Sequence, residues 1–248
     1  MDVALFITCL TDTFAPRVGV AVVRVLRHFG CTVHFPPNQT CCGQPAYNNG
    51  FLREAAALGR RMVDVFEGYP HVVTPSGSCA SMVIHHTPEL LKDDVRYAAR
   101  ARDLAGRTHE FGGFLRDVLK VDVAAIPVRS DRPLTFHYSC HMRGIEPAER
   151  SARLVSGLGG VDYRPVEQME QCCGFGGAFY ALYPNISQAI TQEKVDRLAA
   201  TGAQTVICNE AGCTFTLEGA ARRMGRPLRF LHLAEVLAES LGLMEDEP

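Results

Sequence analysis

A repeated pattern of cysteines constrains this chain more than any other feature of its sequence. One set contains Cys9, Cys41, Cys42 and Cys79, and a second set contains Cys140, Cys172, Cys173 and Cys213. The first three members of the two sets are separated by 131 residues and the last by 134, and a glycine follows each adjacent pair. Because only 10 of the 248 residues are cysteine, repeated matches at one offset indicate a tandem duplication.

The chemistry of thiolates indicates what each set binds. Thiolates are soft donors that select zinc, Cu(I) or iron–sulfur clusters. Adjacent cysteines have Cα atoms about 3.8 Å apart, below the range usual for a disulfide, so the pairs are poor structural disulfides. Four thiolates also suit a tetrahedral zinc site. Zinc sites usually carry Cys-x2–4-Cys spacings, however, and beyond the adjacent pairs only Cys208 and Cys213, with four residues between them, offer one, so we favour iron–sulfur.

Alternating strands and helices are predicted in both halves. Apolar runs predict strands at 3–8, 31–35, 71–74, 134–138, 161–166 and 205–208, and helical spacing predicts helices at 16–29, 51–66, 147–158 and 186–200. This alternation is typical of α/β folds with parallel sheets. We expect two tandem, homologous Rossmann-like halves related by a pseudo-twofold axis, with domains at 1–125 and 130–248. The linker is predicted at 121–133, a charged stretch that includes Arg129 and Asp131.

The cysteines also stand where such a fold binds ligands. In open α/β sheets, ligands bind beyond the carboxyl ends of the strands. Cys9, Cys79, Cys140 and Cys213 all follow predicted strands, on the loops that leave them. Their position is therefore an argument for a site that does not depend on their being cysteines.

Composition narrows the classes of function. The formal net charge is −2 and no basic run is present, which argues against nucleic acid as a partner. No apolar stretch is long enough for a transmembrane segment, and the N-terminus lacks the positive region of a signal peptide. We expect a cytoplasmic protein, and in the cytosol ten cysteines indicate metal or redox chemistry rather than disulfides.

Four sequence motifs resemble a known family. They are Ser76-Gly-Ser-Cys-Ala-Ser-Met82, Tyr138-Ser-Cys140-His141, Gln171-Cys-Cys-Gly-Phe-Gly-Gly177 and Ala211-Gly-Cys213. The doubled Cys, Cys-Cys-Gly, Cys pattern resembles the CCG cysteine-rich domains of heterodisulfide reductase B and of the glycolate oxidase iron–sulfur protein. The motifs resemble the lactate utilisation protein A group more closely, over nearly the whole chain.

The resemblance implies an iron–sulfur electron-transfer component of an L-lactate oxidation complex, a subunit rather than a stand-alone enzyme. It implies partners resembling lactate utilisation proteins B and C, an electron acceptor such as quinone, and contact with the membrane only through partners. All eight duplicated cysteines are the expected metal and cofactor ligands, for one or two clusters per chain of the 4Fe–4S type. No catalytic residue is assigned.

The sequence departs from the fullest pattern of the family. Some CCG domains end in Cys-x-x-Cys and use five thiolates for a noncubane cluster, but here the last position is Met82 in one half and Thr216 in the other. Cys208 could supply a fifth donor, although a buried strand thiol is the preferred interpretation, and Cys31 is interpreted as structural. The chain lacks a ferredoxin-type cysteine run, so we expect electrons to enter from another polypeptide.

Two histidines and two alternative functions complete the interpretation. His141 could hydrogen-bond a ligand, carry a proton or bind the cluster, whereas His137 is better explained as a strand-end histidine hydrogen-bonded to backbone. One alternative function is disulfide reduction, as in heterodisulfide reductase B. The other is a non-redox module in which zinc stabilises a partner-binding surface.

Overall fold

The computed structural model describes residues 1–128 and 132–244, which divide into two compact units at Leu119 and Lys120. Arg129 and Asp131 of the expected linker, and residues 245–248, lie outside the described residues. The residues of the expected linker that precede them form the 3-10 helix η2 (Val123–Ala125) and a β-bridge. The backbone of Gly159 accounts for this, because its N–H donates to Ile126 and its carbonyl accepts from Val128 (both 2.9 Å).

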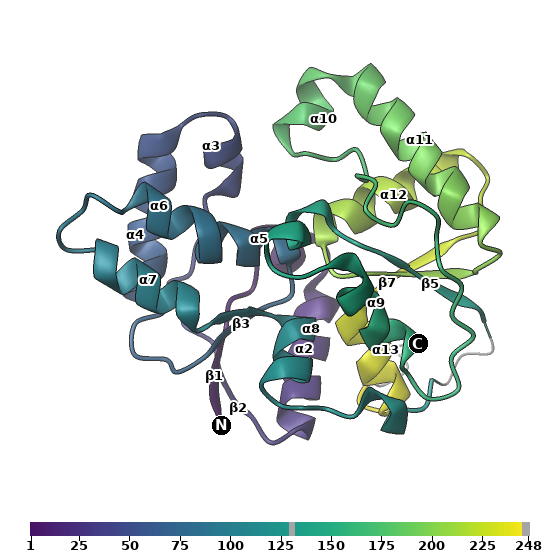
Figure 1. Cartoon of the computed structure of the whole chain (residues 1–248), viewed down its shortest axis with the longest axis horizontal. Coiled ribbons are helices and arrows are strands. Elements are labelled where there is room, and N and C mark those ends of the chain that lie inside the picture. Colours follow the sequence, from purple (N-terminus) through teal and green to yellow (C-terminus); the bar gives the residue numbers. More distant parts are fainter. Residues whose placement is uncertain (129–131, 245–248) are drawn as a thin grey trace. The chain divides into compact units, whose positions relative to one another are not determined.

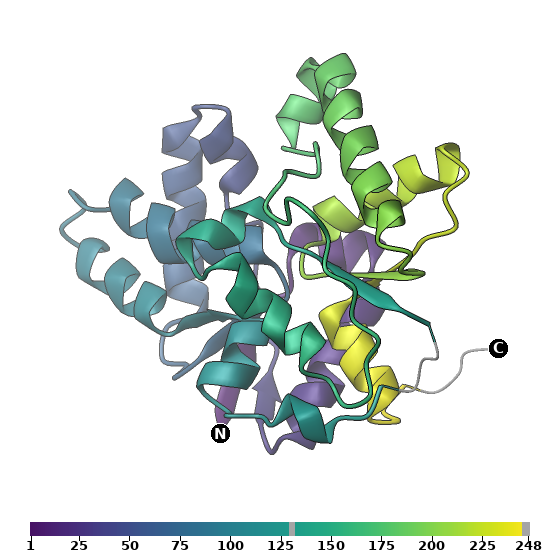
Figure 2. The ribbon, with the colours of Figure 1, turned by 45° about the vertical axis from the view of Figure 1, so that its right-hand side comes forward.

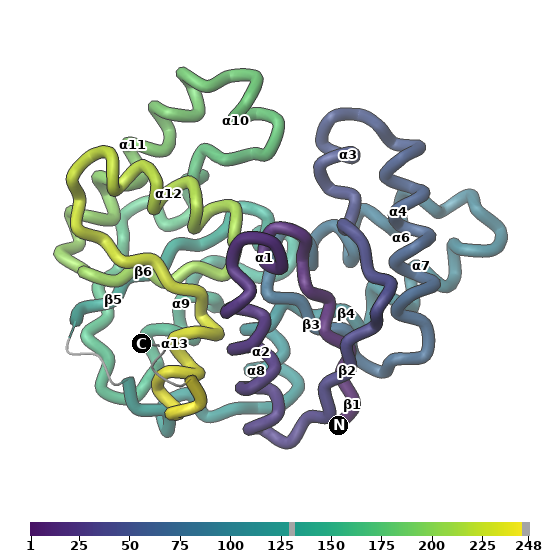
Figure 3. Tube along the Cα trace, turned by 180° about the vertical axis from the view of Figure 1, so that it is seen from behind, coloured from purple at the N-terminus to yellow at the C-terminus, as the bar shows by residue number. Residues whose placement is uncertain are grey.

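The first unit contains a four-stranded parallel sheet with the order β2-β1-β3-β4. Its strands are β1 (Asp2–Leu5), β2 (Thr32–His34), β3 (Val72–Thr74) and β4 (Thr108–Glu110). Its helices are α1 (Cys9–Phe14), α2 (Pro16–His28), α3 (Gln44–Asn48), α4 (Leu52–Val65), α5 (Gly77–Ser81), the π-helical turn η1 (Met82–His86), α6 (Thr87–Leu90), α7 (Ala98–Gly106) and α8 (Phe111–Asp117). Figures 1 and 3 show α2 and α8 on one face of the sheet and α4, α6 and α7 on the other.

The second unit repeats this plan with a three-stranded parallel sheet of order β5-β6-β7. Its strands are β5 (Leu134–His137), β6 (Thr205–Cys208) and β7 (Arg229–His232). Its helices are the 3-10 helix η3 (Cys140–Gly144), α9 (Ala148–Ser156), α10 (Ala178–Leu182), α11 (Pro184–Ala200), α12 (Ala211–Arg223) and α13 (Leu233–Ser240). Helices α11 and α12 cover one face of this sheet and α9 and α13 the other (Figures 1 and 2).

Apolar patterning explains why these segments form these elements. The central strands β3 and β6 are buried along their whole length, as expected for parallel strands covered on both faces. Helix α2 buries Val18, Val22 and Val25, which share one face at helical spacing. It ends before Gly30, whose φ of 80° suits a left-handed helix terminus. The predicted α/β class with parallel sheets is confirmed, while the pseudo-twofold relation stays a prediction.

Two strand predictions differ from the structure. The strand expected at 3–8 ends at Leu5, although the Phe6 N–H still donates to the Val73 carbonyl (2.9 Å). The segment 161–166 forms only an isolated bridge between Tyr163 and Leu134. Pro165 explains the second difference, because a residue without an N–H cannot extend the ladder.

None of the helices in the described parts of the chain is long and apolar enough to cross a bilayer.

Candidate metal centres

The four cysteines of the first unit follow the carboxyl ends of strands or lie in the loop between them. Cys9 is the first residue of α1, and Cys41 and Cys42 lie in the loop before α3. Cys79 is the third residue of α5 and therefore lies in the first helical turn, where a loop was expected. The Ser76 hydroxyl caps that helix by accepting a hydrogen bond from the Cys79 N–H (3.1 Å). The cap fixes the backbone that carries this thiol.

These four thiols touch one another in a row, which we call the N-terminal row. The sulfurs of Cys9 and Cys41 are 3.8 Å apart. Cys41 also hydrogen-bonds to Cys42, and Cys42 in turn to Cys79. Residues that are 70 positions apart in the sequence therefore meet through their side chains.

The second unit forms the same row from its own cysteines, which we call the C-terminal row. Cys140 hydrogen-bonds to Cys172, Cys172 to Cys173, and Cys173 to Cys213. Cys140 opens η3 directly after β5, and Cys213 is the third residue of α12, as Cys79 is of α5. The duplication seen in the sequence is thus reproduced contact by contact in the described structure.

Backbone conformation and close packing explain why a glycine follows each cysteine pair. Gly43 and Gly174 have φ values of 93° and 89°, in the left-handed region that favours glycine. A Cβ on Gly174 would lie 2.3 Å from Thr191 Oγ1 and 2.6 Å from the Ser187 carbonyl oxygen, both on α11. A Cβ on Gly43 would lie 3.3 Å from the Cβ of Leu58. At Gly174 only a residue without a side chain lets the loop approach α11 this closely, whereas at Gly43 the contact with α4 is tight and the left-handed φ is the stronger reason for glycine.

Hydrogen bonding favours the charged form of the second thiol in each row. The pKa of Cys41 is lowered because Cys42 and Cys9 hydrogen-bond to its sulfur, as is the pKa of Cys172 by Cys140 and Cys173. The backbone N–H of Gly174 donates to Cys172 Sγ (3.3 Å), and that of Phe175 points at Cys173 Sγ (3.5 Å). Such donors stabilise a charged sulfur.

The donor set of each row fits a metal centre held by thiolates. Four soft donors are gathered at the edge of a parallel sheet, and backbone amides supply hydrogen bonds to the sulfurs, as they do around iron–sulfur clusters. Metal binding would require the remaining thiols to lose their protons. Clustered cysteines in this arrangement support binding of a metal or an iron–sulfur cluster.

The two histidines near the C-terminal row differ in their surroundings. Nδ1 of His141 lies 3.7 Å from Cys140 Sγ. His137 is 1% exposed at the end of β5, and burial lowers its pKa to about 3. The expectation that His137 is hydrogen-bonded to backbone is wrong, because neither ring nitrogen has a hydrogen-bond partner among residues 1–128 and 132–244. The sequence carried one signal, since a histidine replaces an apolar residue in the position that Phe6 occupies before Cys9.

Lys194 is a buried residue that sequence reasoning missed. It is fully buried on α11, and its Nζ donates to the carbonyl oxygens of Gln168 (3.3 Å) and Met169 (3.0 Å). Burial lowers its pKa to about 8, while the nearby thiols of Cys208 and Cys173 oppose that shift. The signal for it was a lysine on the buried side of a helix, where Met62 stands in the first unit.

The two remaining cysteines lie outside the rows. Cys208 is fully buried in β6, where burial raises the pKa of its thiol, and it hydrogen-bonds to Thr214. Cys31 is buried next to β2. Both surroundings agree with the structural interpretation of these thiols.

A groove lies near the C-terminal row within the second unit. It has a volume of about 800 Å³ and lies between α10, α11 and α12. Phe175, which follows the Cys-Cys-Gly segment, and Phe215, two residues after Cys213, are part of its lining. The groove therefore gives access to the neighbourhood of this row.

Comparison with known proteins identifies the family. The model of the CCG cysteine-rich domain matches residues 3–84 and, a second time, residues 134–218. The chain belongs to the CCG cysteine-rich domain family. The first CCG match contains the whole N-terminal row and the second contains the whole C-terminal row.

Relatives that align with this CCG protein over almost their whole length share one name. The chain is 42% identical to Lactate utilization protein A of Bacillus cytotoxicus over 238 residues, which cover 96% of this chain and 98% of the relative. It is 43% identical to Lactate utilization protein A of Bacillus thuringiensis over 240 residues, with the same two coverages. The resemblance predicted from the sequence is confirmed.

Among solved structures, a hypothetical protein from Helicobacter pylori shares the fold with a TM-score of 0.61 at 11% identity. The alignment covers 100% of this chain and 49% of the other, so this CCG protein spans about half of that chain. At this identity the likeness concerns the fold alone.

Proposed function

We propose that this chain is an iron–sulfur electron-transfer component of an L-lactate oxidation complex. The observation that carries the proposal is the pair of four-thiol rows, each within a CCG domain match, in a chain that is 42–43% identical to proteins named Lactate utilization protein A. In this proposal the eight cysteines of the rows are the ligands, and 1–125 and 130–248 are the two domains.

The residues of each row would hold and tune the cluster. The thiolates of Cys41 and Cys172 would bind first, because hydrogen bonds already favour their charged forms. The N–H groups of Gly174 and Phe175 would stabilise negative charge on the sulfurs and raise the reduction potential of the second centre. When bound, an iron–sulfur cluster supplies one-electron transfer without a proton. The expected cluster type is 4Fe–4S, with one or two per chain, and a complete row of four thiols in each half favours two.

The proposed partners resemble lactate utilisation proteins B and C. Electrons from L-lactate would reach this chain through a partner that handles substrate or flavin, and would leave to an acceptor such as a quinone. The groove near the C-terminal row is the proposed place of approach for a partner, because Phe175 and Phe215 of its lining each lie two residues after a cysteine of the row. We propose a cytoplasmic location, with contact to the membrane only through partners.

Disulfide reduction has less support. Such chemistry would need further thiolates at the positions of Met82 and Thr216, and the side chain of Met82 is fully buried. Turnover of a disulfide substrate by the isolated, iron-loaded chain would favour this second function over electron transfer.

The experiment is anaerobic purification of the chain alone and together with its B-like and C-like partners. We expect a brown protein with equal amounts of iron and sulfide, whose visible absorbance is bleached by L-lactate only when the partners are present. A double variant, Cys42→Ser with Cys173→Ser, serves as the control and should show neither the colour nor the bleaching. A colourless wild-type protein with stoichiometric zinc would overturn the proposal and support the zinc-stabilised module.

A further inference from the structure

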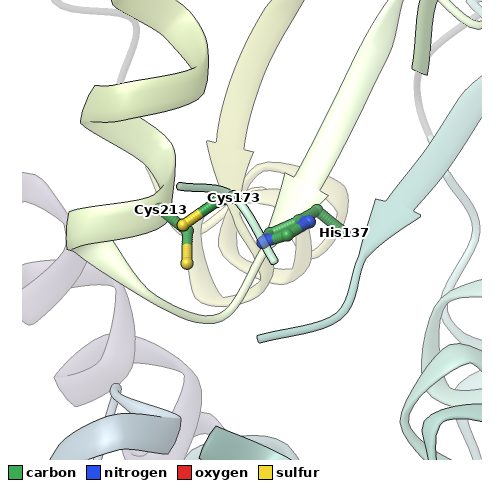
Figure 4. A group of neighbouring side chains, drawn as sticks. All are labelled: His137, Cys173 and Cys213. Atoms are coloured by element: carbon green, nitrogen blue, oxygen red, sulfur yellow. The ribbon is translucent and has the colours of Figure 1, made fainter. Parts of the chain in front are cut away.

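The end of β5 brings a histidine to the C-terminal row. A ring nitrogen of His137 and the sulfurs of Cys173 and Cys213 all lie within 4.8 Å of one another. Figure 4 shows the three side chains converging from a strand, a loop and a helix, with the imidazole at the end of its strand and directed towards the two sulfurs. A mixed set of one imidazole and two thiolates is a donor combination that transition metals accept.

Within the part of the chain that the structure describes, the imidazole of His137 has no hydrogen-bond partner that explains its position. His137 is 1% exposed, and both of its ring nitrogens lack a hydrogen bond. A buried polar group is normally hydrogen-bonded, because leaving it unpaired costs free energy. A ligand beside the two sulfurs would satisfy one of these nitrogens.

Packing alone does not require a histidine here. Three residues before Cys9, in the same position of the repeat, stands Phe6, which is fully buried in the core cluster that contains Cys42 and Cys79. An aromatic side chain without nitrogen therefore fills the corresponding space of the first unit. The His137 ring therefore differs from the Phe6 ring mainly in carrying nitrogen atoms, and much less in its volume.

We propose that His137 is a nitrogen ligand of the metal centre in the C-terminal row, next to Cys173 and Cys213. This inference rests on the proposed function, which supplies the iron–sulfur centre. A neutral imidazole adds no negative charge, so a centre bound by it is less negative than one bound by thiolates alone. We therefore expect the C-terminal centre to have the higher reduction potential of the two.

The test is pulsed EPR on the reduced full-length protein, with histidine labelled with ¹⁵N. The background variant Cys42→Ser leaves only the C-terminal centre, and Cys173→Ser leaves only the N-terminal centre. We expect strong nitrogen coupling in Cys42→Ser and none in Cys173→Ser. Adding His137→Phe to Cys42→Ser should abolish the coupling, whereas adding His141→Phe should preserve it.

The outcomes separate this inference from the proposed function. Wild-type protein without iron would overturn the proposed function, and with it this inference. Iron-replete Cys42→Ser protein without nitrogen coupling would overturn the inference alone, and this measurement requires no change at position 137. Coupling that survives His137→Phe, or that disappears with His141→Phe, would also overturn it.

Discussion

The two halves of the molecule hold the same row of four thiols in different surroundings. Three buried positions of the repeat differ in character: Phe6, Met62 and Thr74 in the first half correspond to His137, Lys194 and Cys208 in the second. The members of each pair occupy the same place in their half. Phe6 and His137 stand three residues before the first cysteine of their row. The second pair is the eleventh residue of α4 and of α11, and the third pair is the last residue of β3 and of β6. The two halves therefore share the row of thiols but differ in the buried residues around it.

The loops that carry the cysteine pairs also differ in the polar side chains that contact them. In the second half, Thr191 donates to the Cys173 carbonyl and Ser187 to the Gly174 carbonyl, both at 2.8 Å. The corresponding residues of α4 are Ala55 and Gly59, which have no side-chain hydroxyl. Hydroxyls of α11 therefore hold the second loop at the cysteine pair itself. The first loop is held before its pair, where Gln39 hydrogen-bonds to the N–H of Ile7 and the Leu5 carbonyl, and Arg61 donates to the Asn38 carbonyl. We infer that the two centres differ in potential and in the rigidity of their supports.

Gly174→Ala is expected to have the largest effect. The new Cβ would meet α11 at 2.3 Å on a backbone with a φ of 89°, so we expect loss of the C-terminal metal and of about 3 kcal/mol of unfolding free energy. Gly43→Ala, with its closest approach at 3.3 Å, should cost only about 1–2 kcal/mol. Denaturant unfolding and iron content measure both, and equal losses would contradict the difference between the loops.

Lys194→Met should have an intermediate effect, because it gives the second half the residue of the first. The carbonyl oxygens of Gln168 and Met169 would lose their donor, at a cost of about 2 kcal/mol. Removing a buried cation should also lower the reduction potential of the C-terminal centre. An EPR-monitored redox titration tests this, with Met62→Leu as the matched control that leaves both potentials in place. If the reduction potential of the C-terminal centre were unaltered in Lys194→Met, the charge of Lys194 would not contribute to the difference between the two halves.

Thr191→Val should have the smallest effect. It removes the hydroxyl that holds the Cys173 carbonyl while keeping a similar volume, so we expect a loss of about 1 kcal/mol in the free energy of unfolding. Thr191→Ser keeps the hydroxyl and should recover most of that loss in the same denaturant titration. If serine and valine behaved alike, the hydrogen bond would not be what holds this loop.

Much of the fold and the meeting of the thiols could be predicted from the sequence. Strands β3 and β6 are mainly apolar and bury every residue, including one threonine each, and such segments indicate parallel strands covered on both faces. Because carboxyl ends of parallel strands meet at one edge of a sheet, cysteines that follow them are brought together. The contacts within each row follow from this topology, whereas metal binding by the cysteines stays a prediction.

Other features depended on contacts that periodicity does not report. Cys79 lies in a helical turn rather than a loop, and the cap by Ser76 three residues earlier was the available sign. Segment 161–166 forms only an isolated bridge because it contains Pro165, a single unsuitable residue in a stretch that otherwise fits a strand. The unpaired state of His137 could not be predicted, because it depends on what the rest of the fold leaves within reach of the ring.

The central claim is that each row binds its own iron–sulfur centre. Iron and sulfide quantitation, with EPR, on anaerobically purified wild type, Cys42→Ser and Cys173→Ser tests it most directly, with Cys31→Ser as a control that should keep its metal. We predict that each row variant loses about half of the iron and sulfide, and that the signals remaining in the two differ from each other. Unchanged iron and sulfide in both row variants would contradict the assignment of these cysteines as ligands.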